Sequence, residues 1–208
     1  TYINHFFKRA PGVFDVVCYT GTGATIQVPH NLGVSPELII LKQRSAGGDW
    51  WTSHSYNTAA YGKVNSTAAF SVFSTWNRTT TTFEADSGNG FSISAGTYVA
   101  YLFATKAGIS KCGSYTGNAT TNTIDCGFTT GARFVLIKRT DSTGDWYVWD
   151  TVRGIIAGND PYLLLNSTTA EVTSTDYIDP VSTGFELSST APAAINASGG
   201  TFIYLAFA

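Results

Sequence analysis

An internal repeat constrains this chain more than any other feature of its sequence. The segment LIILKQR at residues 38–44 recurs as FVLIKR at residues 134–139, an offset of 96 residues. The triplet Gly48-Asp49-Trp50 recurs at the same offset, and residues 65–67 (NST) recur as residues 166–168. Self-similarity at a fixed period is the signature of tandem structural units. We therefore expect two copies of one unit, at residues 13–107 and 108–208.

The segments inside each copy are typical of β-strands. Residues 38–42 and 134–138 are short apolar runs rich in β-branched residues, and residues 98–103 and 202–207 form similar runs near the end of each copy. Links rich in Gly and Asn separate these runs about every ten residues, as turns require. The pattern predicts an all-β chain of two tandem antiparallel β-sandwich repeats of the jelly-roll type. Residues 59–63 could form a single helical turn.

Residues 1–12 have no counterpart at the start of the second copy. They end in Pro11-Gly12, which marks a turn. We expect them to be the last strand of an upstream domain followed by a linker.

Composition narrows the range of functions. Charged residues make up 12% of the chain, against about 25% in average soluble domains, so Ser, Thr and Asn must supply the polar surface. This composition is typical of extracellular and virion-surface β proteins. The net charge is −2 and no basic stripe is present, so no nucleic-acid partner is predicted. No apolar run approaches 18 residues, so no membrane insertion is predicted either.

The three cysteines are Cys18, Cys112 and Cys126, and their odd number argues against a disulfide framework. Residues 111–116 and 122–127 resemble two strands of a hairpin, with Cys112 and Cys126 placed symmetrically about its turn. The favoured interpretation is two buried, reduced thiols. A disulfide across the hairpin is the alternative.

Two groups of residues are candidates for ligand binding. Asp49 and Trp51 in the first copy, and Asp145 and Tyr147 in the second, place a carboxylate near an aromatic ring after a Gly-rich turn, an arrangement that could grip a sugar. The alternative is that these aromatic residues fill the core. The second group lies in the irregular stretch 53–78, where loop aromatics are better placed to contact a ligand: Tyr56, Tyr61 and Trp76.

The sequence does not favour an enzyme. His5, His30 and His54 lie far apart in the sequence, and no metal-ligand spacing is present. Asp145 and Asp150 are five residues apart on an expected strand, which places them on opposite faces. No catalytic residue and no cofactor are therefore predicted. A structural calcium ion is the alternative if loops gather the acidic residues Asp141, Asp145, Asp176 and Asp179.

Several segments resemble repeats in the tail-fibre and virion structural proteins of tailed bacteriophages. They are FKRAPGVFDVV at residues 7–17 with Tyr19-Thr20-Gly21, HNLGVSPE at residues 30–37, Gly144-Asp145-Trp146 with the strand that follows it, and Arg153-Gly154 followed by LLLNST at residues 163–168. The resemblance covers nearly the whole chain, although the first copy lacks an Arg-Gly pair matching Arg153-Gly154. In that family such modules often lie behind lectin-like sandwich domains.

This resemblance implies a virion component of a tail-fibre or receptor-binding type. The expected partners are other copies of the chain in a homotrimer or other homo-oligomer, further virion proteins, and a glycan or protein on the bacterial surface. An architectural part without a ligand of its own, such as a capsid fibre, a decoration protein or a tail-assembly domain, is the alternative. A carbohydrate-binding module or enzyme is a third class.

Overall fold

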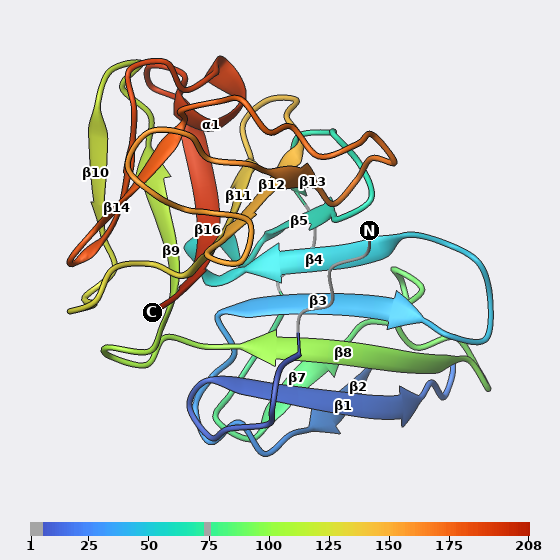
Figure 1. Cartoon of the computed structure of the whole chain (residues 1–208). Helices are drawn as coiled ribbons and strands as arrows, with labels where there is room; N and C mark the ends of the chain where they lie inside the picture. The colour runs from blue at the N-terminus through green and yellow to red at the C-terminus, as the bar shows by residue number, and fades with distance from the viewer. Residues whose placement is uncertain (1–5, 73–75) are drawn as a thin grey trace.

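The computed structural model describes residues 6–72 and 76–208, and it is an all-β sandwich protein (Figure 1). The first repeat has a larger sheet of strand order β1-β8-β3-β4-β5-β6 and a smaller sheet, β2-β7. All of its paired strands are antiparallel. Its strands are β1 (Phe14–Thr20), β2 (Ile26–Pro29), β3 (Leu38–Gln43), β4 (Trp50–His54), β5 (Ala60–Lys63), β6 (Ser71–Val72), β7 (Thr82–Ala85) and β8 (Thr97–Phe103).

The second repeat has the same arrangement. Its larger sheet has the order β9-β16-β11-β12-β13, which matches β1-β8-β3-β4-β5 strand for strand, and its smaller sheet is β10-β15-β14. The repeat in the sequence therefore corresponds to a repeated topology. The strands are β9 (Ser110–Thr116), β10 (Asn122–Asp125), β11 (Phe134–Arg139), β12 (Trp146–Asp150), β13 (Leu163–Leu164), β14 (Ile178–Val181), β15 (Gly184–Leu187) and β16 (Thr201–Phe207).

Each repeat has its own core between its larger and smaller sheets. Alternating residues of the larger sheet face this core, as the two-residue period of a strand requires. In the first repeat Ile39, Leu41 and Phe83 are buried there, and in the second Val135, Ile137 and Phe185 are buried in the same way. Two cores of this kind explain the repeated apolar runs of the sequence.

A third core, which we call the seam, joins the two repeats. It forms where the outer faces of the two larger sheets meet, and it includes Phe103 from β8 and Leu136 and Leu205 from the second repeat. Figure 1 shows β9 and β16 of the second repeat running across the direction of β3 and β8. The two repeats are therefore packed into one unit. The residues buried in the seam are Phe14, Leu38, Phe103, Cys112, Leu136, Trp146, Val148, Ile203 and Leu205.

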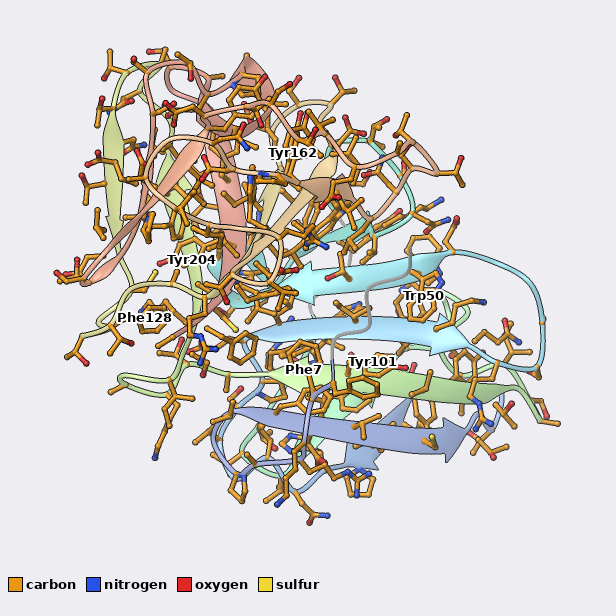
Figure 2. All side chains as sticks on the ribbon, viewed as in Figure 1. Phe7, Trp50, Tyr101, Phe128, Tyr162 and Tyr204 are labelled. Carbon is orange, nitrogen blue, oxygen red and sulfur yellow. The ribbon has the colours of Figure 1, made fainter. Side chains whose placement is uncertain are left out.

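The segment before β1 packs against this seam. The ring centroid of Phe7 lies 5.4 Å from that of Phe14 and 5.5 Å from that of Phe207, so it contacts both repeats (Figure 2). The expected strand of an upstream domain is not seen in residues 6–12, where Ala10 forms a single bridge to Phe14. The rest of that prediction, at residues 1–5, lies outside the described residues.

Two local predictions were wrong. The strands expected around Cys112 and Cys126 exist, but β9 pairs with β16 and β10 pairs with β15, so they form no hairpin. Both thiols are buried and free. Residues 59–63 are not helical, since they contain β5, and a single 3₁₀ turn (Ser55–Asn57) comes before them. Hydrogen bonding across β4 and β5 outweighs the weak helical tendency of this short segment.

Among the described residues, the remaining helical structure is α1 (Ala193–Asn196). In the part of the chain that the structure describes, no helix is long and apolar enough to cross a membrane.

Candidate functional site: a pocket between the two repeats

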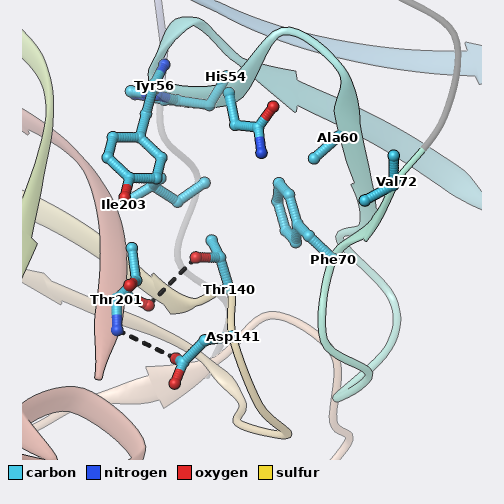
Figure 3. A pocket seen from close by; sticks show the side chains of 10 residues that line it. His54, Tyr56, Ala60, Phe70, Val72, Thr140, Asp141, Thr201 and Ile203 are labelled. Atoms are coloured by element: carbon cyan, nitrogen blue, oxygen red, sulfur yellow. Dashed lines mark hydrogen bonds between the residues drawn. The ribbon is translucent and has the colours of Figure 1, made fainter. Parts of the chain in front are cut away.

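A pocket of about 230 Å³ lies where the two repeats meet beside β5 and β6 (Figure 3). His54, Tyr56 and Phe70 line it from the first repeat, and Asp141 and Ile203 line it from the second. Figure 3 shows Phe70 and Ile203 on opposite sides of the space, with Asp141 at one end. Neither repeat alone could form this pocket.

The turn after β4 places an aromatic ring at this pocket. β4 ends at His54, and the His54 ring Nδ1 accepts a hydrogen bond of 3.0 Å from the backbone N–H of Tyr56. This is an N-cap, which satisfies a donor that the start of the 3₁₀ turn would otherwise leave free. The capped turn holds the Tyr56 side chain outward, with 53% of its surface exposed.

His54 is a neutral group at the wall of the pocket. Burial, and then the nearby guanidinium of Arg78, lower the pKa of His54 to about 3. Because Nδ1 accepts a hydrogen bond, the proton of the neutral ring is assigned to Nε2. Nε2 has no hydrogen-bond partner among the described residues. His54 is therefore unsuited to general-base chemistry at neutral pH.

Arg78 holds the base of this region together. Its guanidinium donates to the carbonyl oxygens of Pro36 and Glu37, each at 3.3 Å, and to Ser53 Oγ at 2.7 Å. Burial lowers the pKa of Arg78 to about 10, which still leaves it charged at neutral pH. The hydrogen bonds of the Arg78 guanidinium thus support β4 beneath the pocket.

The second repeat contributes hydroxyls and one carboxylate. Thr140 Oγ1 donates to the Thr201 carbonyl at 3.2 Å, and Asp141 accepts from the Thr201 backbone N–H at 3.0 Å. Asp141 also pairs with Arg139 at 3.0 Å, and this hydrogen-bonded ion pair lowers the pKa of the carboxyl. The charge of Asp141 is therefore already neutralised by its own repeat.

The lining of the pocket is thus mixed and nearly uncharged. Apolar groups come from Ala60, Phe70, Val72 and Ile203, and polar groups come from Asn57, Thr140 and Thr201. No Lys or Arg is among the described residues that line it, so these residues offer an anionic ligand no counter-ion. The pocket is also smaller than the roughly 300–1,000 Å³ of sites for drug-sized ligands. It fits a single small, neutral and partly apolar group.

Comparison with known proteins gives the family of the chain but no function. The family model described as Domain of unknown function (DUF7483) matches residues 9–208, nearly the whole chain. The chain belongs to the DUF7483 family. No curated protein matches it. No solved structure matches it either.

In this DUF7483 chain, two of the predicted site residues have structural roles. Asn65 donates to Asp49 Oδ1 at 3.0 Å and accepts from the Trp50 backbone N–H at 2.9 Å. Asn166 makes the same pair of bonds to Asp145, at 2.7 Å, and to the Trp146 N–H, at 2.7 Å. Each asparagine therefore ties a turn to the start of a strand. This clamp explains why the Gly-Asp-Trp and Asn-Ser-Thr segments recur together.

The predicted aromatic residues fall into three positions. Trp76 is 3% exposed and Tyr147 is 7% exposed, so the prediction that they present a contact surface was wrong: both fill repeat cores. Trp51 and Tyr61 are half-buried and pack against each other at 5.1 Å. Lys63 covers Trp51, with Nζ 4.7 Å from the ring centroid, and pairs with Asp49 at 2.7 Å. Tyr56 is the predicted residue that lies at the pocket.

Sequence reasoning missed the half of the pocket formed by the second repeat. Thr140, Thr201 and Ile203 carry no motif, and Asp141 was considered only as a calcium ligand. These residues become neighbours of Tyr56 because the repeats pack along the seam. The acidic residues considered for calcium do not come together. Among the residues that the structure describes, no group of three or more His, Cys, Asp or Glu side chains is arranged to hold a metal ion.

Proposed function

We propose that this chain is a surface module of a tailed-phage virion that attaches to a bacterial surface glycan, and that the pocket between its repeats holds one neutral sugar unit. The observation that carries the proposal is the position of Tyr56, half-exposed at a pocket lined by apolar groups and hydroxyls. A pyranose ring has apolar C–H faces and hydroxyl edges, so the aromatic ring of Tyr56 beside neutral polar groups suits it. The resemblance of residues 7–17 and 30–37 to tail-fibre repeats supports the virion setting.

The described lining residues include no cation, and this sets the expected specificity. With Asp141 paired to Arg139, a neutral sugar meets no unpaired charge, whereas an acidic sugar would leave its carboxylate without a counter-ion. The proposed ligand is therefore a neutral hexose or acetamido sugar within a longer surface polysaccharide.

The experiment is binding of the fluorescently labelled protein to bacteria, with purified surface polysaccharides as competitors. We expect saturable binding that neutral polysaccharides remove and that Tyr56→Ala weakens at least about tenfold, the equivalent of roughly 1.4 kcal/mol. Phe6→Ala is the matched control, because Phe6 is an aromatic side chain, 91% exposed, outside the pocket. Equal losses in both variants would contradict the pocket assignment.

The architectural alternative is favoured by a different observation, namely the extensive apolar seam that already joins two repeats of the same kind. If the folded wild-type protein binds no bacterium and no polysaccharide, the receptor-binding proposal fails and the architectural function takes its place.

A further inference from the structure

One contact between the two repeats joins a loop of the first repeat to a face of the second. A loop of the first repeat, residues 63–70, lies on a face of the second repeat formed by residues 138–146, and we call these the docking loop and the docking face. The Trp146 indole N–H donates to the Lys63 carbonyl at 2.9 Å. The Gly144 N–H donates to the Thr67 carbonyl at 2.9 Å, and the Phe70 N–H donates to the Thr140 carbonyl at 2.9 Å.

Lys138 adds hydrogen bonds to the same contact. Its ammonium donates to the Thr67 carbonyl at 3.0 Å and to the Gly144 carbonyl, and its side chain is fully buried. Val64 of the loop packs against the apolar residues of the seam. The docking loop and docking face therefore share hydrogen bonds, a buried cation and an apolar contact.

The first repeat has the equivalent of this docking face, and it is open. Lys42 pairs with Trp50 as Lys138 pairs with Trp146, and Gly48 precedes Trp50 in the repeated triplet as Gly144 precedes Trp146. Trp146 is 1% exposed, whereas Trp50 is 36% exposed and stacks on Tyr101 at 6.2 Å, on the outer face of the sheet (Figure 2). The Lys42 ammonium bonds to carbonyls of its own turn, those of Gln43 and Ala46.

The second repeat has the equivalent of the docking loop, and that loop is also open. The Leu165 N–H donates to the Trp146 carbonyl as the Val64 N–H donates to the Trp50 carbonyl, so Leu165 takes the position of Val64. Leu165 is 48% exposed, and residues 167–171 are exposed as well. One chain thus carries one joined loop-and-face pair and the two halves of a second pair, unjoined.

We propose that the open face around Trp50 receives the open loop around Leu165 from a second copy of this chain. The joined pair inside the chain is the template for this contact, because both partners have the same backbone arrangement. An interface in which different surfaces meet is heterologous, and such interfaces either close into a ring or continue as a filament. The proposed contact between two chains repeats the contact that the docking loop and the docking face make within one chain. It does not depend on the proposed sugar site.

The test uses two variants that each remove one surface, Trp50→Glu and Leu165→Glu, with size measured by light scattering during gel filtration. The wild type is expected to be oligomeric, and each variant alone is expected to be monomeric with a melting temperature close to that of the wild type. When the two variants are mixed, one intact loop and one intact face remain. The mixture should therefore form a 1:1 dimer and nothing larger.

Each other result overturns the proposal. A wild type that stays monomeric at about 1 mM, where even weak specific interfaces associate, has no such contact. Oligomers that persist in both variants use another surface. Two monomeric variants that remain monomeric on mixing share an interface that is not heterologous. Val152→Glu, at an apolar residue 88% exposed on another loop, is the control that should leave the oligomer intact.

Discussion

His54 of the first repeat and Asp150 of the second occupy the same position in their sheets and cap the same turn. His54 pairs with Leu38 across its sheet, and Asp150 pairs with the equivalent Phe134. His54 Nδ1 accepts the backbone N–H two residues later at 3.0 Å, and Asp150 Oδ1 accepts the N–H of Val152, also two residues later, at 3.0 Å. A histidine and an aspartate thus each provide the acceptor that the backbone N–H of the following turn requires.

This equivalence predicts that His54→Asp folds nearly as well as the wild type. The carboxylate can accept the Tyr56 N–H, and the guanidinium of Arg78 is close enough to lower the pKa of His54 and so to favour a negative charge. His54→Ala loses the cap, which costs about 1 kcal/mol, and adds a cavity penalty. Urea unfolding of both variants checks this. A His54→Asp variant less stable than His54→Ala would contradict the shared role.

The two asparagine clamps should differ in strength. Asn166→Ala and Asn65→Ala each remove two hydrogen bonds, at about 0.5–1.5 kcal/mol apiece. Asn166 is half-buried and Asn65 is exposed, so we expect the larger loss of unfolding free energy from Asn166→Ala. Thermal unfolding of both variants measures the difference. Equal, small losses would show that the clamps add little to either turn.

Lys138 and Lys42 form a second matched pair. Lys138→Met removes two hydrogen bonds from a buried cation to carbonyls on both sides of the seam, and we expect a loss of about 1–3 kcal/mol. Lys42→Met breaks bonds within one turn of a half-exposed side chain and should cost less than about 1 kcal/mol. Unfolding in guanidinium chloride tests this order. The reverse order would show that Lys138 does not stabilise the contact between the repeats.

Asp160 should give stability a dependence on acid pH. It is fully buried, and its Oδ2 accepts from the backbone N–H groups of Tyr177 and Ile178 at 3.1 and 3.0 Å. Burial raises the pKa of Asp160 to about 6, against 3.8 for the free side chain. The folded state thus holds this proton more tightly, so the contribution to stability is greatest below pH 4 and falls as the pH rises to 6.

Asp160→Asn removes this ionisation while keeping an oxygen to accept the two N–H groups. As the pH rises from 4 to 6, the unfolding free energy of the wild type should fall relative to that of the variant. The fall should be at most about 3 kcal/mol, at 1.36 kcal/mol per pKa unit. Urea unfolding at pH 4, 5, 6 and 7 measures it. Parallel pH profiles would show that Asp160 titrates normally.

The sequence predicted the fold class because strand signals are local. The apolar runs that became β3 and β11 are buried by contacts that any β-sandwich supplies. Pairing is less local: nothing near Cys112 or Cys126 distinguishes strands that form a hairpin from strands that enter different sheets, and the hairpin prediction failed for that reason.

The candidate site was predicted only in part, for a related reason. Tyr56 could be selected because it lies in an irregular stretch of the sequence, residues 53–78, but Thr140 and Ile203 reach the same pocket through packing of the repeats. Trp50 and Trp146 make the limit clear. They hold the same position in the repeat, and one is exposed while the other is buried, because burial depends on what another part of the molecule covers.

The burial of Lys138 makes the junction of the repeats observable by chemistry. An amine-reactive reagent can reach Lys42 in the native protein, since its side chain is half-exposed, whereas Lys138 is fully covered. Modification of Lys138 requires the docking loop to lift away, a local opening that needs no global unfolding. The rate at which Lys138 is acylated relative to Lys42, read by mass spectrometry, therefore reports how often the docking loop lifts from the docking face.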